Sequence, residues 1–286
     1  MLNLFSKILS LLPLHIVHAL GSALGRCVQL IAQRPIETLR SNLSNSGLFS
    51  NQIAYENAVK ANIKETGKSF LETLMIWQLS DNEAVSLVKS CHGWEHVEQA
   101  ISNGNGLIFL TPHLGCYEIT SIYYASKHPI TVLFRPARQS WLNPLIQRGR
   151  SKGQVKLAPA TTIGVRLLMQ ALKRGEAIGI LPDQTPIKGE GEWAPFFGKP
   201  AYTMALAGKL AEKTGATIIM AFGERLPNGE GFEIHLNKLE SGSIANPSLL
   251  NQALEAQIKQ FPEQYLWAYN RYKISNDNHP PPESKS

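Results

Sequence analysis

The chain has 286 residues, of which 43% are hydrophobic and 17% charged, with a formal net charge of +6. This length allows one large core, and a mean hydropathy of −0.12 excludes a polytopic membrane protein. The mild basic excess suits anionic lipid or an acidic carrier protein, whereas the lack of zinc spacing, nucleic-acid motifs and interleaved aromatics predicts no nucleic-acid partner.

The N-terminus is the most apolar part of the chain. The run from Ile8 to Gly25 is as long as a membrane span, but it contains Pro13 and two histidines and has a basic residue at each end. We predict an uncleaved anchor helix within residues 1–32 that lies in or dips into one leaflet. A buried core helix, or a signal peptide cleaved near Ala19-Leu20-Gly21, remains an alternative.

The next hundred residues are predicted to be mainly helical. Residues 35–50 are polar and rich in turn formers, residues 52–79 show helical periodicity, and residues 83–102 indicate two shorter helices. In the last stretch, His92 and His96 are predicted to be solvated surface residues rather than metal ligands.

From residue 106 onward, strand-like and helix-like runs alternate. This alternation predicts an α/β domain over residues 33–275, with a mostly parallel central sheet flanked by helices, followed by a disordered tail at 276–286. The expected strands are 107–111, 130–134, 154–157, 177–181, 217–222 and 232–236, and the expected helices are 116–127, 141–150, 162–174, 203–214 and 248–260.

A histidine and a carboxylate follow the first of these strands. His113 comes just after Pro112, at the carboxyl end of a strand, where α/β sheets bind ligands. We predict that His113 is a general base and that Glu118, one turn into the next helix, orients its ring. Backbone N–H groups at that helix start, or an arginine, are candidate donors to an oxyanion. A surface histidine, or Cys116 as a thiol nucleophile, are the competing interpretations.

Further candidate residues follow later strands. Arg135, Arg148 and Arg150 lie in a basic stretch that also holds Arg138 and Asn143, and guanidinium groups pair well with phosphate. Asp183 and Gln184 follow another strand end, where Asp183 could order an arginine or bind acceptor hydroxyls; a simple turn is the alternative. The long loop 185–200 carries Phe196 and Phe197, which we predict to shape an acyl-chain groove; a self-packed surface loop is the alternative. Trp267 and Tyr269 are predicted to be core aromatics.

Four ordered blocks together resemble a known family. Residues 113–118 (HLGCYE) resemble the His-x4-Asp/Glu motif of the glycerolipid and lysophospholipid acyltransferase superfamily. The others resemble blocks of the bacterial lipid A late acyltransferases, the lauroyl/myristoyl transferases, over roughly residues 1–275. These blocks are 134–136 (FRP) with 142–145 (LNPL) and 148–150 (RGR), 181–184 (LPDQ) with 194–198 (APFFG), and 262–267 (PEQYLW) with Arg271 and Lys273.

The resemblance implies an enzyme of lipopolysaccharide biosynthesis. It would transfer a fatty acyl chain from acyl-acyl carrier protein to a hydroxyl of a phosphorylated lipid A precursor. It would act on the cytoplasmic face of the inner membrane, without a metal or bound cofactor. Residues 269–271 (YNR) depart from the His-Arg-Arg run usual in the family. A lysophospholipid or 1-acylglycerol-phosphate acyltransferase, a thioester hydrolase and a non-catalytic membrane-associated lipid-binding protein are the alternatives.

The three cysteines give no structural framework. Cys27, Cys91 and Cys116 are odd in number and widely spaced, so they form neither a disulfide set nor a Cys-x-x-Cys site. This pattern favours a reducing compartment.

Overall fold

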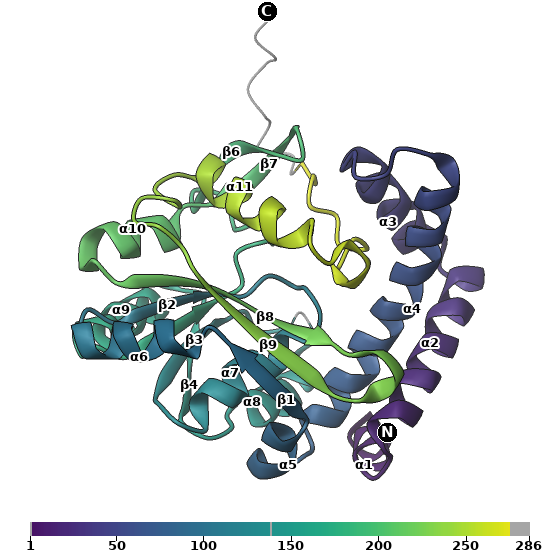
Figure 1. The fold of residues 1–286 in the computed structure, drawn as a ribbon, viewed down its shortest axis with the longest axis horizontal. Coiled ribbons are helices and arrows are strands. Elements are labelled where there is room, and N and C mark those ends of the chain that lie inside the picture. Colours follow the sequence, from purple (N-terminus) through teal and green to yellow (C-terminus); the bar gives the residue numbers. More distant parts are fainter. Residues whose placement is uncertain (1, 138, 275–286) are drawn as a thin grey trace, which may run out of the picture.

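A seven-stranded sheet forms the centre of the computed structural model, which describes residues 2–137 and 139–274 (Figure 1). The strand order is β1-β9-β8-β2-β5-β3-β4, and every neighbouring pair is parallel except β8 with β9. The predicted α/β class and mostly parallel sheet are therefore confirmed. The strands are β1 (Val88–His92), β2 (Leu107–Leu110), β3 (Ile130–Phe134), β4 (Val155–Pro159), β5 (Ala177–Ile180), β8 (Thr217–Arg225) and β9 (Phe232–Lys238). The predicted tail at 276–286 lies outside the described residues.

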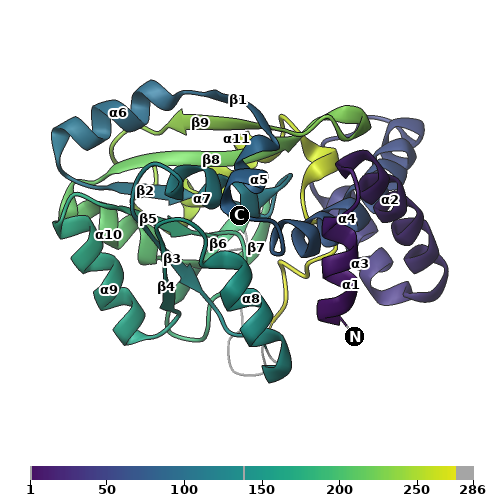
Figure 2. The ribbon, with the colours of Figure 1, turned by 90° about the horizontal axis from the view of Figure 1, so that it is seen from below.

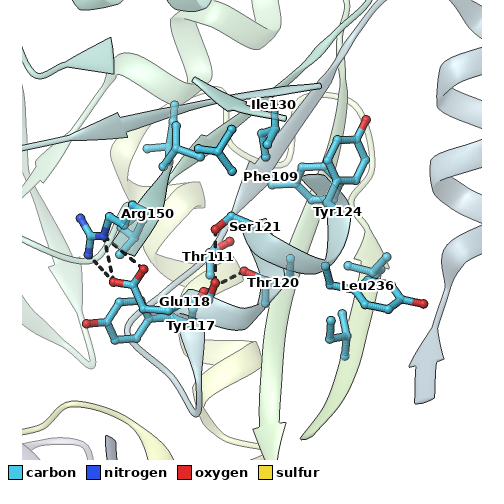
Figure 3. Close-up of a pocket in the computed structure, with 18 of the residues that line it drawn as sticks. Phe109, Thr111, Tyr117, Glu118, Thr120, Ser121, Tyr124, Ile130, Arg150 and Leu236 are labelled. Atoms are coloured by element: carbon cyan, nitrogen blue, oxygen red, sulfur yellow. Dashed lines mark hydrogen bonds and ion pairs between the residues drawn. The ribbon is translucent and has the colours of Figure 1, made fainter. Parts of the chain in front are cut away.

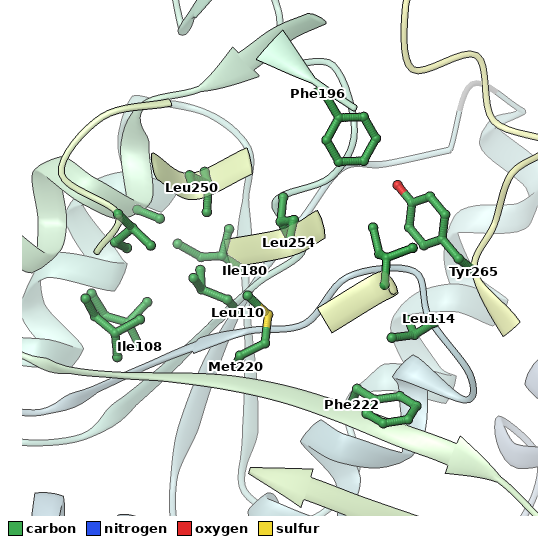
Figure 4. Close-up of a cluster of buried hydrophobic side chains, with 14 of the residues drawn as sticks. Ile108, Leu110, Leu114, Ile180, Phe196, Met220, Phe222, Leu250, Leu254 and Tyr265 are labelled. Atoms are coloured by element: carbon green, nitrogen blue, oxygen red, sulfur yellow. The ribbon is translucent and has the colours of Figure 1, made fainter. Parts of the chain in front are cut away.

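Helices cover both faces of this sheet, so its central strands are buried on both sides. Alternate residues of β2 point into two separate apolar clusters: Ile108 and Leu110 into one (Figure 4), Leu107 and Phe109 into the other. This explains why the central strands read as continuous apolar runs. The covering helices are α5 (Asp81–Ser86), α6 (Trp94–Asn103), α7 (Tyr117–Ala125), α8 (Asn143–Arg150), α9 (Thr162–Lys173), α10 (Leu206–Thr214) and α11 (Pro247–Ile258).

Four N-terminal helices form a layer at one end of the sheet (Figure 2). They are α1 (Leu2–Ser10), α2 (Leu14–Ile31), α3 (Gln33–Asn45) and α4 (Gln52–Ile76). The segment 1–32 is therefore two helices, because Pro13 separates α1 from α2. Helices α2 and α4 pack backbone to backbone: a Cβ added at Gly67 would lie 2.1 Å from the carbonyl oxygen of Gly21. Helix α2 is thus docked on the domain along one face.

A buried ionic network joins this helical layer to the sheet. Glu72 of α4 accepts a hydrogen bond of 2.8 Å from His18 of α2 and one of 2.7 Å from Nε of Arg225, at the end of β8. All three side chains are at most 5% exposed. Burial alone would disfavour the ionised form of Glu72, but the charge and hydrogen bonds of Arg225 and His18 outweigh it and lower the pKa of Glu72 to about 2.

Three segments differ from the sequence prediction. Residues 33–45 form α3 instead of turns, because Leu39 and Leu43 are buried in the core despite the low helix propensity of the intervening Ser and Asn residues. Residues 88–92 form strand β1, which the helical reading of 83–102 missed, because β9 supplies its pairing partner. The predicted loop 185–200 contains strand β6 (Gly191–Phe196) and the start of its partner β7 (Lys199–Met204).

Candidate active site

The neighbouring strands β2 and β5 place His113 and Asp183 together. The strands are parallel, with Leu110 opposite Ile180, so their carboxyl ends lie at the same edge of the sheet. His113 and Asp183 each lie three residues beyond the last residue of their strand. The two residues therefore meet, although 70 positions separate them in the sequence.

Asp183 holds His113 through two hydrogen bonds. Its Oδ1 lies 2.8 Å from Nδ1 of the imidazole, and its Oδ2 accepts the backbone N–H of His113 at 2.9 Å. The Nε2 atom lies 3.2 Å from the side-chain nitrogen of Gln184. Because an ionised carboxylate can only accept, Nδ1 carries the proton and Nε2 carries the lone pair that receives the Gln184 amide. This is the tautomer that a general base needs at Nε2.

The electrostatic surroundings keep Asp183 ionised. Its side chain is 2% exposed. Although burial disfavours the charged form, the facing His113 and its hydrogen bonds hold the pKa of Asp183 below its usual value. Tyr265 lies close by, and burial together with the charge of Asp183 raises the pKa of its hydroxyl. Asp183 is therefore a buried partner of the imidazole whose charged form is favoured by its surroundings.

The loop that carries His113 is locked from two directions. Gly115 has φ +58°, and a Cβ there would lie 2.1 Å from the carbonyl oxygen of Gly223, so only glycine fits. The N–H of Cys116 donates to Gly223 of β8 at 2.7 Å, and the carbonyl of His113 accepts the N–H of Leu266 at 3.0 Å. The N–H of Gly115 donates to Gln264. The N–H groups of Leu114, Gly115 and Cys116 are therefore already paired within the fold and are not available to an oxyanion.

Glu118 does not orient His113, contrary to the sequence prediction. Its carboxylate instead accepts Nε of Arg150 at 2.9 and 3.1 Å and also binds Nη2 (Figure 3). Burial opposes the charge on Arg150, but Glu118 raises the pKa of the guanidinium. Glu118 is 4% exposed and comes from the first turn of α7, whereas Arg150 ends α8. The pair fixes Arg150 beside the site, and Asp183 is the carboxylate that contacts the imidazole of His113.

A cleft of about 530 Å³ opens at His113. Of the predicted binding residues, Arg135, Arg150 and Gln184 line it. Its apolar wall comes from the end of β3, from α8, α9 and α10, and from the residue after β5: Leu133, Phe134, Ile146, Val165, Leu181 and Leu206. A charged residue, a base and an apolar wall thus share one hollow, the arrangement typical of a site for an amphiphilic substrate.

The other predicted binding residues lie elsewhere. The side chain of Asn143 caps the preceding loop by accepting the N–H of Ala137 at 2.7 Å, and Arg148 is an exposed residue outside the cleft lining. Arg138 lies outside the described residues. Asp183 binds His113 rather than an arginine or an acceptor.

Phe196 and Phe197 do not line an acyl groove, so that prediction is wrong. Both belong to the buried apolar cluster in which Figure 4 labels Phe196. Phe197 packs on Trp267 with ring centroids 5.6 Å apart. Trp267 is buried, as predicted, whereas Tyr269 is half-buried and accepts the N–H of Thr185. Arg271 is also buried, and donates to the carbonyl of Tyr202 at 2.8 Å. These C-terminal residues therefore pack in the core and hold the segment that follows Gln184.

A second, narrow cavity lies between α7 and the sheet (Figure 3). Phe109, Ile130 and Tyr124 give it an apolar lining, and Arg150 and Leu181 belong both to its wall and to the cleft. The Glu118–Arg150 pair therefore stands between the cleft and the apolar interior.

Cys116 is not a nucleophile. Its thiol is 2% exposed, and burial raises its pKa well above the usual value. A protonated thiol inside the core neither reaches the cleft nor attacks an acyl group.

Comparison with known proteins agrees with this geometry. The model of the bacterial lipid A biosynthesis acyltransferase family matches residues 1–274. The chain belongs to this family. It is 22% identical to the lipid A biosynthesis lauroyltransferase of Escherichia coli (strain K12), over 94% of this chain and 89% of the relative. It is 23% identical to the lipid A biosynthesis palmitoleoyltransferase of the same organism, over 92% and 86%. A lipid A biosynthesis acyltransferase of Haemophilus influenzae is 24% identical, over 65% and 59%.

Family membership fixes the class of reaction. This lipid A acyltransferase is an enzyme, and it transfers an acyl group to lipid A. The reading of the chain as a non-catalytic lipid-binding protein is thereby set aside. Asp183 as the partner of His113 was missed because only the order of strands in the sheet brings them together. The available signal was that both residues follow apolar strands.

Proposed function

We propose that this lipid A acyltransferase uses His113 as the general base for transfer from acyl-acyl carrier protein to a hydroxyl of a phosphorylated lipid A precursor. The observation that carries the proposal is the Asp183–His113–Gln184 chain of contacts at the rim of the cleft. Nε2 takes the hydroxyl proton as the oxygen attacks the thioester carbonyl. Collapse of the tetrahedral intermediate expels the carrier thiolate, which receives the proton from the imidazolium.

Each neighbouring group then has a distinct task. Asp183 is the positioning residue, because it fixes the proton on Nδ1 and offsets the charge on the imidazolium. Arg150, held by Glu118, is the donor to the developing oxyanion. Arg135, exposed at the end of β3, is placed to bind a phosphate of the acceptor. The basic excess of the chain favours docking of an acidic carrier protein.

The acyl chain is assigned to the apolar wall of the cleft. That wall replaces the aromatic loop of the sequence prediction, because Leu133, Val165 and Leu181 face the same hollow as His113 whereas Phe196 is in the core. Burial of each CH₂ on such a wall is worth about 0.8 kcal/mol, which is enough to hold a fatty chain against water.

Replacing His113 with alanine tests the base assignment. We expect acyl transfer to fall by about 10²- to 10⁴-fold, because the hydroxyl loses its proton acceptor. The measurement is the mass of the product formed from acyl-acyl carrier protein and a lipid A precursor. His96→Ala, at a histidine outside the cleft, is the matched control and should leave the rate unchanged. Full transfer by a folded His113→Ala chain contradicts the proposal. A parallel reaction without acceptor measures thioester hydrolysis.

The N-terminal segment 1–32 is proposed to anchor the remaining domain, residues 33–275, to the cytoplasmic face of the inner membrane. Helix α2 is the one helix in the described part of the chain that is long and apolar enough to span a membrane. However, its docking on α4 and the buried His18 favour a helix lying in the interface. Large apolar side chains nevertheless remain exposed on α1, on α2 and in the turn between them: Leu4, Phe5, Ile8, Leu11, Ile16, Leu20, Leu30 and Ile31.

Charging the exposed face of α1 tests this anchor. Leu4 and Ile8 are 65% and 52% exposed and lie one turn apart, so Leu4→Asp with Ile8→Asp should leave the fold intact. We expect most of the protein to lose its binding to phosphatidylglycerol-containing vesicles in a flotation assay, because carboxylates cannot enter the acyl boundary. Ile163→Asp, at an exposed site on α9, is the control. Equal flotation of the double variant and the control would mean that α1 is not the anchor.

A further inference from the structure

Four potential metal ligands gather on one face of the sheet, outside the active site. In the pairing of β8 with β9, Glu224 lies opposite Glu233 and Phe222 lies opposite His235. In the pairing of β1 with β9, His92 lies opposite His235. Because opposite residues in a sheet project to the same face, two imidazoles and two carboxylates from three strands share this face. The sequence gives no hint of this, since β1 was not recognised as a strand.

The contacts within this cluster are close. Nε2 of His235 lies 2.8 Å from Oε2 of Glu224, and Nε2 of His92 lies 3.4 Å from Oε2 of Glu233. The two imidazole rings stack, with centroids 5.2 Å apart. One ligand atom from each of Glu224, Glu233 and His235 lies within 4.8 Å of the others. The donor atoms of these three residues therefore already converge on one point, and His92 joins the cluster through its contact with Glu233.

The cluster brings two carboxylates together on paired strands. Two carboxylates directly opposite each other on paired strands repel, which disfavours the sheet unless a cation lies between them. Among the described residues, neither Glu224 nor Glu233 forms an ion pair with a lysine or an arginine; their ion-pair partners are the two histidines. A divalent ion would cancel both negative charges and take a lone pair from each imidazole.

We propose that His92, His235, Glu224 and Glu233 bind a divalent transition-metal ion of the zinc type. Imidazole nitrogen with carboxylate oxygen is a ligand set that zinc accepts, and tetrahedral ligands at about 2.1 Å from the ion are about 3.4 Å apart, as Nε2 of His92 and Oε2 of Glu233 are. The ion displaces the protons shared in the His–Glu contacts, so binding releases protons. His235 is also stacked on Phe222, with ring centroids 5.0 Å apart, which fixes its orientation.

Such an ion would cross-link the three strands β1, β8 and β9. It joins the edge strand β1 to the β8–β9 hairpin, and β8 carries Gly223, which holds the loop of His113. The site is therefore structural: it stabilises the part of the sheet that supports the catalytic loop, without contacting the cleft.

Zinc titration of the full-length, untagged chain in detergent micelles tests the site. We expect about one equivalent of Zn²⁺ by equilibrium dialysis, a visible absorption band with Co²⁺ typical of nitrogen and oxygen ligands, and a rise in Tm on adding ZnCl₂. Mg²⁺ should not compete, because imidazole is a poor ligand for it. The double variant His92→Ala with Glu233→Gln should bind zinc at least about tenfold more weakly and lose the rise in Tm.

Two controls make the result decisive. His96→Ala should bind zinc as the wild type does, and His113→Ala should do so as well, because neither belongs to the cluster. Both His92 and Glu233 are partly exposed, so the double variant should keep its far-ultraviolet circular dichroism spectrum. Unchanged zinc affinity in the folded double variant overturns the proposal, as does loss of zinc binding in His113→Ala alone or a wild-type chain that binds no zinc.

Discussion

Asp183→Asn should lower kcat for acyl transfer by about 10²- to 10⁴-fold with little change in KM. Asp183 accepts two hydrogen bonds from His113, one from the ring and one from the backbone N–H. Asparagine has one acceptor and one donor, so it cannot satisfy both. If its oxygen takes the backbone N–H, its NH₂ group donates to Nδ1 and the proton moves to Nε2, where the base must be empty.

Two further measurements distinguish a positioning role of Asp183 from a merely structural one. They are the pH–rate profile of Asp183 variants and the activity of a Glu118 variant. Asp183→Glu keeps the charge and should recover part of the rate, while Asp183→Asn should also shift the acidic limb of the profile. Glu118→Gln should keep the imidazole tautomer, because Glu118 contacts Arg150 instead. Wild-type kcat in Asp183→Asn beside an inactive Glu118→Gln chain would return the orienting role to Glu118.

Glu72→Ala should reduce the free energy of unfolding by about 3–5 kcal/mol, because it leaves the buried guanidinium of Arg225 without its main partner. His18 loses its only hydrogen bond in the described part of the chain as well. The matched control is Glu56→Ala on the same helix. Its partner Arg40 is 37% exposed, so that loss should stay within about 1 kcal/mol. Urea denaturation of both variants in detergent measures the difference, and equal stability of the two variants would contradict the assigned role.

Lowering the pH should weaken the same interaction in the wild type and reduce its free energy of unfolding. Because the pKa of Glu72 falls from 4.5 in the unfolded chain to about 2 in the folded chain, the unfolded state binds the proton first as pH falls. The stabilisation from this carboxylate is complete above about pH 4.5 and disappears as pH drops through about 2. Glu72→Gln should flatten this part of the stability curve. A wild-type curve with the same slope as that of the variant would show that folding does not lower the pKa of Glu72.

The parts of the fold that the sequence predicted well are those where burial is continuous. Strand β3 was predicted residue for residue at 130–134, because it is an apolar run between polar turns. Strand β1 was missed, because its residues are mostly partly exposed and its pairing with β9 spans more than 140 positions. Helix α3 was missed, because tertiary packing of Leu39 and Leu43 outweighs local propensity.

The candidate site divides in the same way. His113 could be found from its place after a strand, and Arg135 and Gln184 from theirs. Asp183, the partner of His113, could not be found in this way. Glu118 is the nearest carboxylate in the sequence, whereas Asp183 is brought to His113 because β5 lies beside β2 in the sheet. The position of Phe196 and Phe197 also depends on strand pairing that the local sequence does not show. The segment rich in Gly and Pro forms a hairpin, which buries them near Trp267.

The network of His18, Glu72 and Arg225 has a consequence for the order of events during synthesis. The apolar helices α1 and α2 are synthesised before the sheet, and Arg225 is synthesised 153 residues after Glu72. Glu72 follows His18 by only 54 residues, so α2 can pair with α4 before the sheet is complete, and Arg225 is the last member of the network to be made. In the proposed anchoring, lipid would cover the exposed leucine and isoleucine side chains of α2 during this interval. With the proposed anchor, the nascent chain would reach the bilayer before its catalytic domain has folded, and that domain would fold at the membrane.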